Sequence, residues 1–170
     1  MASNQIIPEQ KSSTTSLARY LPAGTGPAYC GPGVRITFLV TGAESGGALF
    51  VFENLVAPGG GAPPHLHIRE DESFYLQQGT LVLQVGGKVI NASAGDFVYI
   101  PRGTVHSFKN TSQETARLLT VVTPPGLENF FSEALLPAAD IGNMPEAPDA
   151  MMARARKAAS RHGLEFSIPA

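Results

Sequence analysis

Between Val34 and Thr123 the chain is divided into short β-prone runs that glycine-rich turns separate. No helical hydrophobic period interrupts this series, so the pattern predicts an all-β sandwich or barrel. The 18 glycines and 14 prolines among 170 residues also suit many turns and short strands better than long helices. We expect a loop at 57–64 and strands at 34–41, 48–56, 73–77, 80–85, 88–91, 97–100, 105–109 and 116–123.

The segments on either side of this series differ from it. Residues 1–33 are polar and then rich in Gly and Pro, and they predict an N-terminal arm that wraps the domain or pairs with a neighbouring chain. Apolar residues recur at helical spacing in 127–136, which predicts an amphipathic helix covering the barrel. A proline-rich linker, a second helix over 149–162 and a short strand at 164–168 should follow. The expected organisation is therefore an arm (1–33), a barrel (34–126) and a helical C-terminal extension (127–170).

Composition excludes several classes of function. The formal net charge of −2 provides no electrostatic footprint for nucleic acid or for an anionic membrane surface. A single cysteine excludes an internal disulfide framework. No apolar run approaches the ~20 residues that a membrane-spanning helix needs, and the first 20 residues lack the apolar core of a secretion signal. We therefore expect a cytoplasmic protein with a small-molecule partner.

Three of the four histidines lie in two segments with defined internal spacing. The first reads Gly59-x5-His65-x-His67-x4-Glu72-x6-Gly79, and the second reads Gly95-x5-Pro101-x-Gly103-x2-His106-x3-Asn110. Because side chains alternate along a strand, His65 and His67 point the same way, roughly 7 Å apart. Two imidazoles at that distance can converge on one metal ion.

The remaining ligands require the chain to change direction. Glu72 can join the two histidines only if the chain bends at residues 68–71, and His106 must arrive from another strand that faces the same interior. Asp71 is the alternative carboxylate if Glu72 points away. Taken singly, each histidine could be a surface residue or a hydrogen-bonded core residue, and Glu70–Glu72 could be a solvated acidic turn. The combined spacing favours a metal site.

The two segments resemble the paired motifs of the cupin superfamily at all their defining positions. The resemblance covers residues 34–123 and implies a six- to eight-stranded antiparallel jelly-roll barrel with a metal near one mouth. By position, the metal ligands would be His65, His67, Glu72 and His106. Such a ligand set accepts one divalent Fe, Mn, Co, Ni, Cu or Zn ion. Many small jelly-roll proteins of this kind are homodimers, which we also expect here.

The flanks resemble the quercetin 2,3-dioxygenase-like group of small single-domain bacterial cupins. The similar segments are residues 125–133 and the closing Arg161-His-Gly-Leu-Glu-Phe166. The resemblance implies a dioxygenase that cleaves an enolic or flavonol-like aromatic substrate with O₂. Glu72 would then be the catalytic residue as well as a ligand, accepting the proton of an enolic hydroxyl. The alternatives are a metal-dependent isomerase, cyclase or lyase that does not use O₂, and a small-molecule binding module without turnover.

Apolar side chains in the strands predict the wall of a substrate pocket. A wall of this kind suits a flat, partly aromatic molecule, although the same side chains could form the core of the barrel. The predicted pocket residues are Phe50, Phe52, Phe74, Leu76, Phe97, Tyr99 and Phe108.

Overall fold

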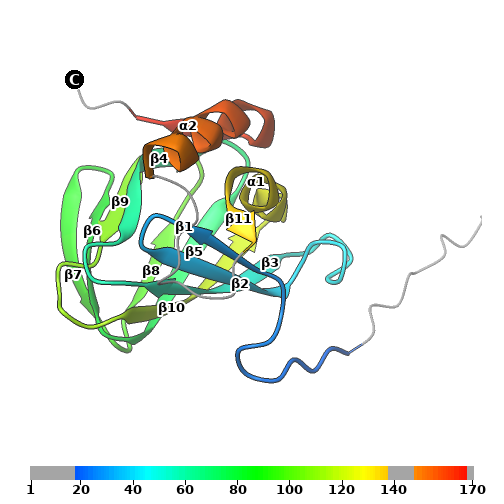
Figure 1. Cartoon of the computed structure of the whole chain (residues 1–170), viewed down its shortest axis with the longest axis horizontal. Helices are drawn as coiled ribbons and strands as arrows, with labels where there is room; N and C mark the ends of the chain where they lie inside the picture. Colours follow the sequence, from blue (N-terminus) through cyan, green and yellow to red (C-terminus); the bar gives the residue numbers. More distant parts are fainter. Residues whose placement is uncertain (1–17, 138–147, 168–170) are drawn as a thin grey trace, which may run out of the picture.

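The computed structural model describes residues 18–137 and 148–167, and its strands form two antiparallel sheets (Figure 1). In the larger sheet the strand order is β11 (Leu136–Pro137), β1 (Ala28–Gly31), β2 (Val34–Val40), β3 (Phe50–Val56), β10 (Ala116–Thr123), β5 (Asp71–Gln78) and β8 (Phe97–Ile100). In the smaller sheet it is β12 (Leu164–Phe166), β4 (Gly61–His67), β9 (His106–Lys109), β6 (Thr80–Val85) and β7 (Lys88–Ser93). This arrangement is the antiparallel jelly roll that the sequence predicts.

The two sheets pack face to face around an apolar core. One buried cluster joins Phe74, Leu76 and Leu118 of the larger sheet to Leu81 and Leu83 of the smaller one. Side chains alternate between the two faces of each strand, and these residues occupy the inward-facing positions. Burial of that face fixes the register of each strand. The sheets thus enclose the interior to which the histidine-bearing strands contribute.

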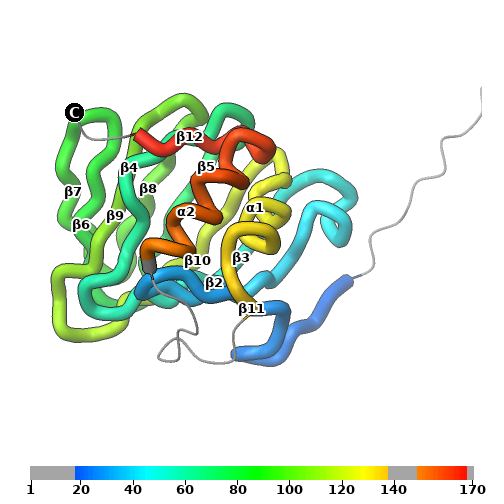
Figure 2. The backbone as a smooth tube through the Cα atoms, turned by 45° about the horizontal axis from the view of Figure 1, so that its top comes forward, coloured from blue at the N-terminus to red at the C-terminus, as the bar shows by residue number. Residues whose placement is uncertain are grey.

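Two helices cover one side of the barrel. They are α1 (Leu127–Ala134) and α2 (Pro148–Ala159), followed by the short 3₁₀ helix η1 (Ser160–His162). Figures 1 and 2 show α1 and α2 side by side. Their apolar faces share a second buried cluster with Phe38, Phe50 and Phe52 of the larger sheet. The C-terminal extension is therefore part of the packed fold.

Contacts between α1 and η1 hold this extension in place. His162 Nε2 lies 2.7 Å from Glu133 Oε2, and Arg161 also contacts the Glu133 carboxylate. Gly163 then takes a left-handed conformation with φ 72°, which ends the 3₁₀ helix. Strand β12 follows and pairs with β4, so that Leu164 lies opposite His67 and Phe166 opposite His65.

The structure differs from the sequence prediction at three places. Residues 28–31, expected in an arm, form β1 and pair with β2 and β11 of the same chain. Strand β4 begins at Gly61, within the expected loop, and its register with β9 shifts between Ala62 and His65, where two prolines interrupt the ladder. Helix α1 ends at Ala134 rather than at residue 136, because Leu135 is extended and Leu136–Pro137 pair with β1.

Three expectations fall partly outside the described residues. They are the first part of the arm (1–17), most of the proline-rich linker (138–147) and residues 168–170, the first of which was expected to end the last strand. Within the described ranges, no helix has both the length and the apolar character needed to cross a membrane.

Candidate metal centre

Three strands bring His65, His67, Glu72 and His106 together. The alternation of β4 directs His65 and His67 to the same interior face, and both are buried. The chain then bends at residues 68–70 and passes into the larger sheet, where Glu72 is the second residue of β5. His106 begins β9 and lies directly opposite His65 in the β4–β9 ladder. The bend that the spacing requires is therefore present.

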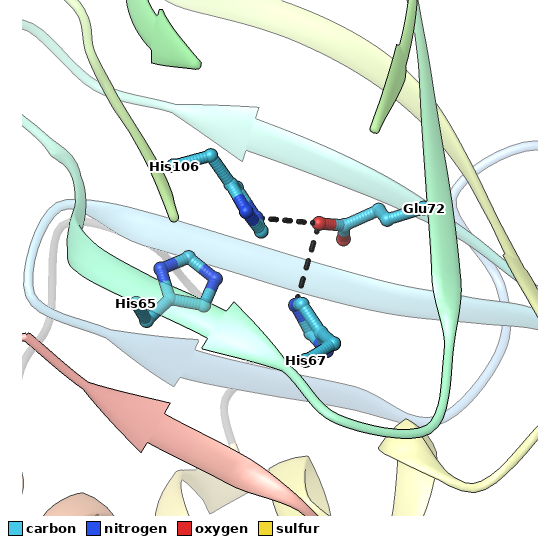
Figure 3. Close-up of side chains that lie close together, drawn as sticks. All are labelled: His65, His67, Glu72 and His106. Atoms are coloured by element: carbon cyan, nitrogen blue, oxygen red, sulfur yellow. Dashed lines mark hydrogen bonds and ion pairs between the residues drawn. The ribbon is translucent and has the colours of Figure 1, made fainter. Parts of the chain in front are cut away.

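The four side chains converge on a common point (Figure 3). Each offers one ligand atom, and these atoms all lie within 4.8 Å of one another. Glu72 Oε2 is 3.1 Å from His106 Nε2 and 3.5 Å from His67 Nε2. All four residues are buried. Three imidazoles and one carboxylate at these separations can hold a divalent transition metal and leave coordination positions open.

Backbone carbonyls orient two of the imidazoles. The His65 Nδ1–H donates to Pro63 O at 2.8 Å, and the His106 Nδ1–H donates to Thr104 O at 2.9 Å. A proton held on Nδ1 leaves the Nε2 lone pair available to a metal. Both rings are therefore set in the tautomer that ligation requires.

His67 gives the clearest sign that the site fits a metal. Both of its ring nitrogens are buried and have no hydrogen-bond partner. Buried polar atoms are nearly always satisfied, so an unpartnered imidazole between other potential ligands calls for an explanation. A metal on Nε2 provides one. Glu70, whose carboxylate Oε2 lies 3.9 Å from His67 Nδ1, stands behind the ring on its other side.

The electrostatics of the site favour the ligand forms of His65 and Glu72. Burial, reinforced by the neighbouring His106 and His67, lowers the pKa of His65 to about 3. Burial would raise the pKa of Glu72, but its contacts with His106 and His67 outweigh this effect and hold it well below the usual range. Burial likewise opposes protonation of His106, whereas its contact with Glu72 raises its pKa. A neutral His65 and an ionised Glu72 are the forms that bind metals.

Asp71, the alternative carboxylate in the sequence prediction, points elsewhere. Its Oδ1 accepts hydrogen bonds from the backbone N and the Nε of Arg102, both at 2.9 Å. Arg102 lies in the Pro101–Gly103 turn, and Gly103 has φ 77° as that turn requires. The Gly103 N–H donates to His67 O at 2.7 Å. Asp71 therefore ties the two motif segments together and leaves the ligand position to Glu72.

A cavity opens from the ligand set towards the C-terminal helices. It has a volume of about 110 Å³, several times the space that one water molecule needs. His65, His67 and Glu72 line it together with strands of both sheets. Helix α2 adds Met151, Met152 and Ala155, which the sequence analysis did not place at the site. No residue spacing indicates such a contribution, because it depends on how the extension docks.

Three of the seven predicted pocket residues line this cavity, namely Phe52, Phe74 and Phe108. The other four predicted pocket residues do not line it. Phe50 and Leu76 are buried in the two core clusters and do not reach the cavity. Phe97 and Tyr99 are 64% and 55% exposed, because the alternation of β8 turns Val98 and Ile100 inward instead.

Comparisons with known proteins agree with this architecture. Residues 53–122 match the Cupin domain family model. Quercetin 2,3-dioxygenase of Bacillus subtilis (strain 168) is 34% identical over 67 residues, which are 39% of this chain and 20% of that protein. Germin-like protein subfamily 2 member 1 of Arabidopsis thaliana is 34% identical over 106 residues, 58% of this chain and 46% of that protein. The chain thus spans less than half of the length of either relative.

Among solved structures, an RmlC-like cupin from Shewanella frigidimarina is similar in fold. Its TM-score is 0.56 at 17% identity, and the match covers 67% of this chain and 98% of that one. The fold and the buried His₃Glu set define a jelly-roll protein with a candidate metal centre. Together with the match of residues 53–122 to the Cupin domain family model, they identify the barrel as a cupin domain.

Proposed function

We propose that this protein is a metal-dependent dioxygenase that cleaves an enolic, flavonol-like aromatic substrate with O₂. The observation that carries the proposal is the character of the cavity beside the metal ligands. Apart from the metal ligands and Asn54, its described wall consists of aromatic, aliphatic and thioether residues with glycine and proline, and it contains no lysine or arginine. Such a wall suits a flat apolar molecule better than a sugar phosphate or a small dicarboxylate, either of which needs cationic partners. The similarity to a quercetin 2,3-dioxygenase supports the same reading.

The metal would be one divalent Fe, Mn, Co, Ni, Cu or Zn ion held by His65, His67, Glu72 and His106. When bound, it supplies Lewis-acid chemistry towards the enolic oxygen and O₂. The protein's own part is to position the substrate against this centre and to exclude water. The buried ligands and the apolar wall do both.

Glu72 is the proposed proton acceptor. Its carboxylate is ionised and buried, and it faces the point on which the histidines converge. A carboxylate within hydrogen-bond reach can take the proton of the enolic hydroxyl and return it to the product. For a flavonol, both atoms of O₂ enter the products, a phenolic ester and carbon monoxide. The substrate supplies all the electrons, so no external reductant is required.

Oxygen uptake by metal-loaded protein tests the proposal. Tag-free protein loaded separately with each metal is mixed with a flavonol in a closed oxygen electrode, and product is followed by mass spectrometry. We expect uptake of one O₂ per flavonol consumed. Glu72→Gln should lower turnover by roughly 10²–10⁴-fold, the usual range for a general base, and should weaken metal binding much less.

Glu53→Gln is the matched control, because Glu53 pairs with Arg117 at 3.5 Å and lies away from the ligand set. Equal losses of turnover and metal affinity in Glu72→Gln would contradict the base role. Product without oxygen uptake would instead indicate an isomerase, cyclase or lyase. Stabilisation by the flavonol without any product would indicate a binding module.

A further inference from the structure

A single amide interrupts the apolar wall of the cavity. Asn54 lies on β3, where the inward positions alternate as Phe50, Phe52, Asn54 and Val56. The side chain is 4% exposed, and its Oδ1 is buried without a hydrogen-bond partner. Apart from the metal-ligand set, Asn54 is the one polar side chain among the described residues that line this cavity.

An unpartnered amide oxygen in this position calls for a donor from outside the protein. Native structures satisfy nearly all buried polar atoms, and an aliphatic residue at position 54 would pack against its neighbours without a loss. Thr120 on β10 provides a comparison, because its Oγ1 is also buried and unpartnered. Thr120 does not line the cavity, so a ligand there can contact Asn54 and cannot reach Thr120.

The strand registers place Asn54 away from Glu72. Val122 of β10 lies opposite both Glu72 and Phe50, whereas Leu118 lies opposite both Leu76 and Asn54. Asn54 is thus displaced by four residues along the strands from the level of Glu72, roughly 13 Å at the usual rise per residue. A ligand that contacts both needs the length of a molecule with two or three fused or linked rings. A small acid is too short.

The wall contributed by the helices favours aromatic rings between these two points. Met151 and Met152 of α2 and Phe131 of α1 line the same cavity. A thioether beside an aromatic ring makes a favourable contact, and methionine adapts its shape to flat ligands. The cavity thus offers a metal centre, an apolar middle and one amide.

We propose that Asn54 determines the substrate specificity of this cavity by binding a hydroxyl group on the ligand. The hydroxyl is carried at the end remote from the enolic oxygen, and its O–H donates to Asn54 Oδ1. This inference rests on the proposed function for the enolic end of the ligand. It narrows the substrate class to flat, multi-ring phenols that carry a second hydroxyl.

Anaerobic binding of two probes tests the inference. Quercetin carries hydroxyls on all its rings, whereas 3-hydroxyflavone carries only the enolic one. Dissociation constants are measured by calorimetry for metal-loaded wild type, Asn54→Leu and Thr120→Val. We expect Asn54→Leu to weaken the binding of quercetin roughly tenfold, which corresponds to the loss of about one hydrogen bond. The dissociation constant of 3-hydroxyflavone should not change. Thr120→Val should change neither constant, and both variants should keep the metal content of the wild type.

The inference is overturned if Asn54→Leu changes the two dissociation constants equally or changes neither. It is also overturned if the wild type binds neither probe. Asn54→Ala repeats the comparison if the leucine variant does not fold. Oxygen plays no part here, so the two proposals fail separately. Quercetin binding that depends on Asn54 without oxygen uptake contradicts only the dioxygenase proposal. If the protein takes up oxygen, but the ratio of the two dissociation constants is the same in wild type and Asn54→Leu, only the role of Asn54 is contradicted.

Discussion

Glu70 is the residue near the metal centre that the spacing of the motif does not reveal. It is only 2% exposed, and burial raises its pKa. Its Oε2 is buried without a hydrogen-bond partner and lies 3.9 Å from Nδ1 of His67. A carboxylate behind a metal-bound imidazole orients the ring and increases its basicity. Glu70 would do for His67 what backbone carbonyls do for His65 and His106.

Metal affinity is therefore expected to depend on Glu70. Glu70→Gln keeps the size of the side chain and should weaken metal binding by about 10–100-fold, the usual cost of removing such a partner. Competition with a chromogenic chelator measures the dissociation constant, and Glu53→Gln again serves as the control. An unchanged affinity for Glu70→Gln would show that the carboxylate does not act on His67.

The spacing of residues in the sequence predicts which side chains can act as metal ligands. It does not predict which other polar side chains the packing of the fold buries. The alternation of β4 and the bend before Glu72 follow from spacing, and the structure brings these residues together. Glu70 and Asp71 are neighbours in one acidic segment, and the sequence does not distinguish them. In the folded protein Glu70 is buried, whereas Asp71 pairs with Arg102. That Asn54 Oδ1 has no hydrogen-bond partner likewise depends on neighbours from other strands.

Between elements, the Asp71–Arg102 pair joins the start of β5 to the turn before β9. Hydrogen bonds from the Arg102 side chain and backbone hold the pKa of Asp71 well below its usual range. Because the folded-state pKa is depressed, the stabilisation is complete above the unfolded pKa of about 3.9 and is lost as the pH falls through the lower folded value. The Arg102 side chain is 49% exposed and that of Asp71 is 20% exposed, so solvent screening keeps the effect modest.

Asp71→Asn should accordingly lower the Tm at pH 7, and the difference from wild type should shrink once the pH falls below about 3.9. Thermal unfolding at a series of pH values measures this, with Arg102→Gln and the double variant completing a cycle. Additive effects of the two substitutions at pH 7 would mean that the pair does not stabilise the turns.

The prediction of elements was most accurate where a hydrophobic period is uninterrupted. Strands β2, β3, β6 and β10 and both helices lie close to their expected ranges. The start of β4 was missed, because Pro63-Pro64 is typical of a loop and a strand tolerates such a pair only at a break in the ladder. The prediction that Phe97 and Tyr99 of β8 face the interior was also wrong, because a run of four residues does not show which face of the strand is buried.

For the whole molecule, the ligand set connects the two sheets. His65, His67 and His106 belong to the smaller sheet and Glu72 to the larger one. A bound metal therefore links both layers and should stabilise the folded state. At a free metal concentration 100 times the Kd, the gain is about 2.7 kcal/mol, or roughly 5–10 °C in Tm for a chain of this size. Calorimetric scans with metal and with chelator measure it, and equal Tm values would show that the metal does not bind the folded protein.

We expect His65, His67, Glu72 and His106 to bind one transition-metal ion together. Metal content per chain, measured by plasma mass spectrometry on tag-free protein, tests it most directly. The measurement is made beside His65→Ala and His106→Ala variants whose folding is checked by circular dichroism. We expect about one transition-metal ion per wild-type chain and a large loss in both variants. If the wild-type protein stays metal-free after incubation with Fe, Mn, Co, Ni, Cu and Zn, or if the variants retain the full metal content, these four residues do not form the metal site.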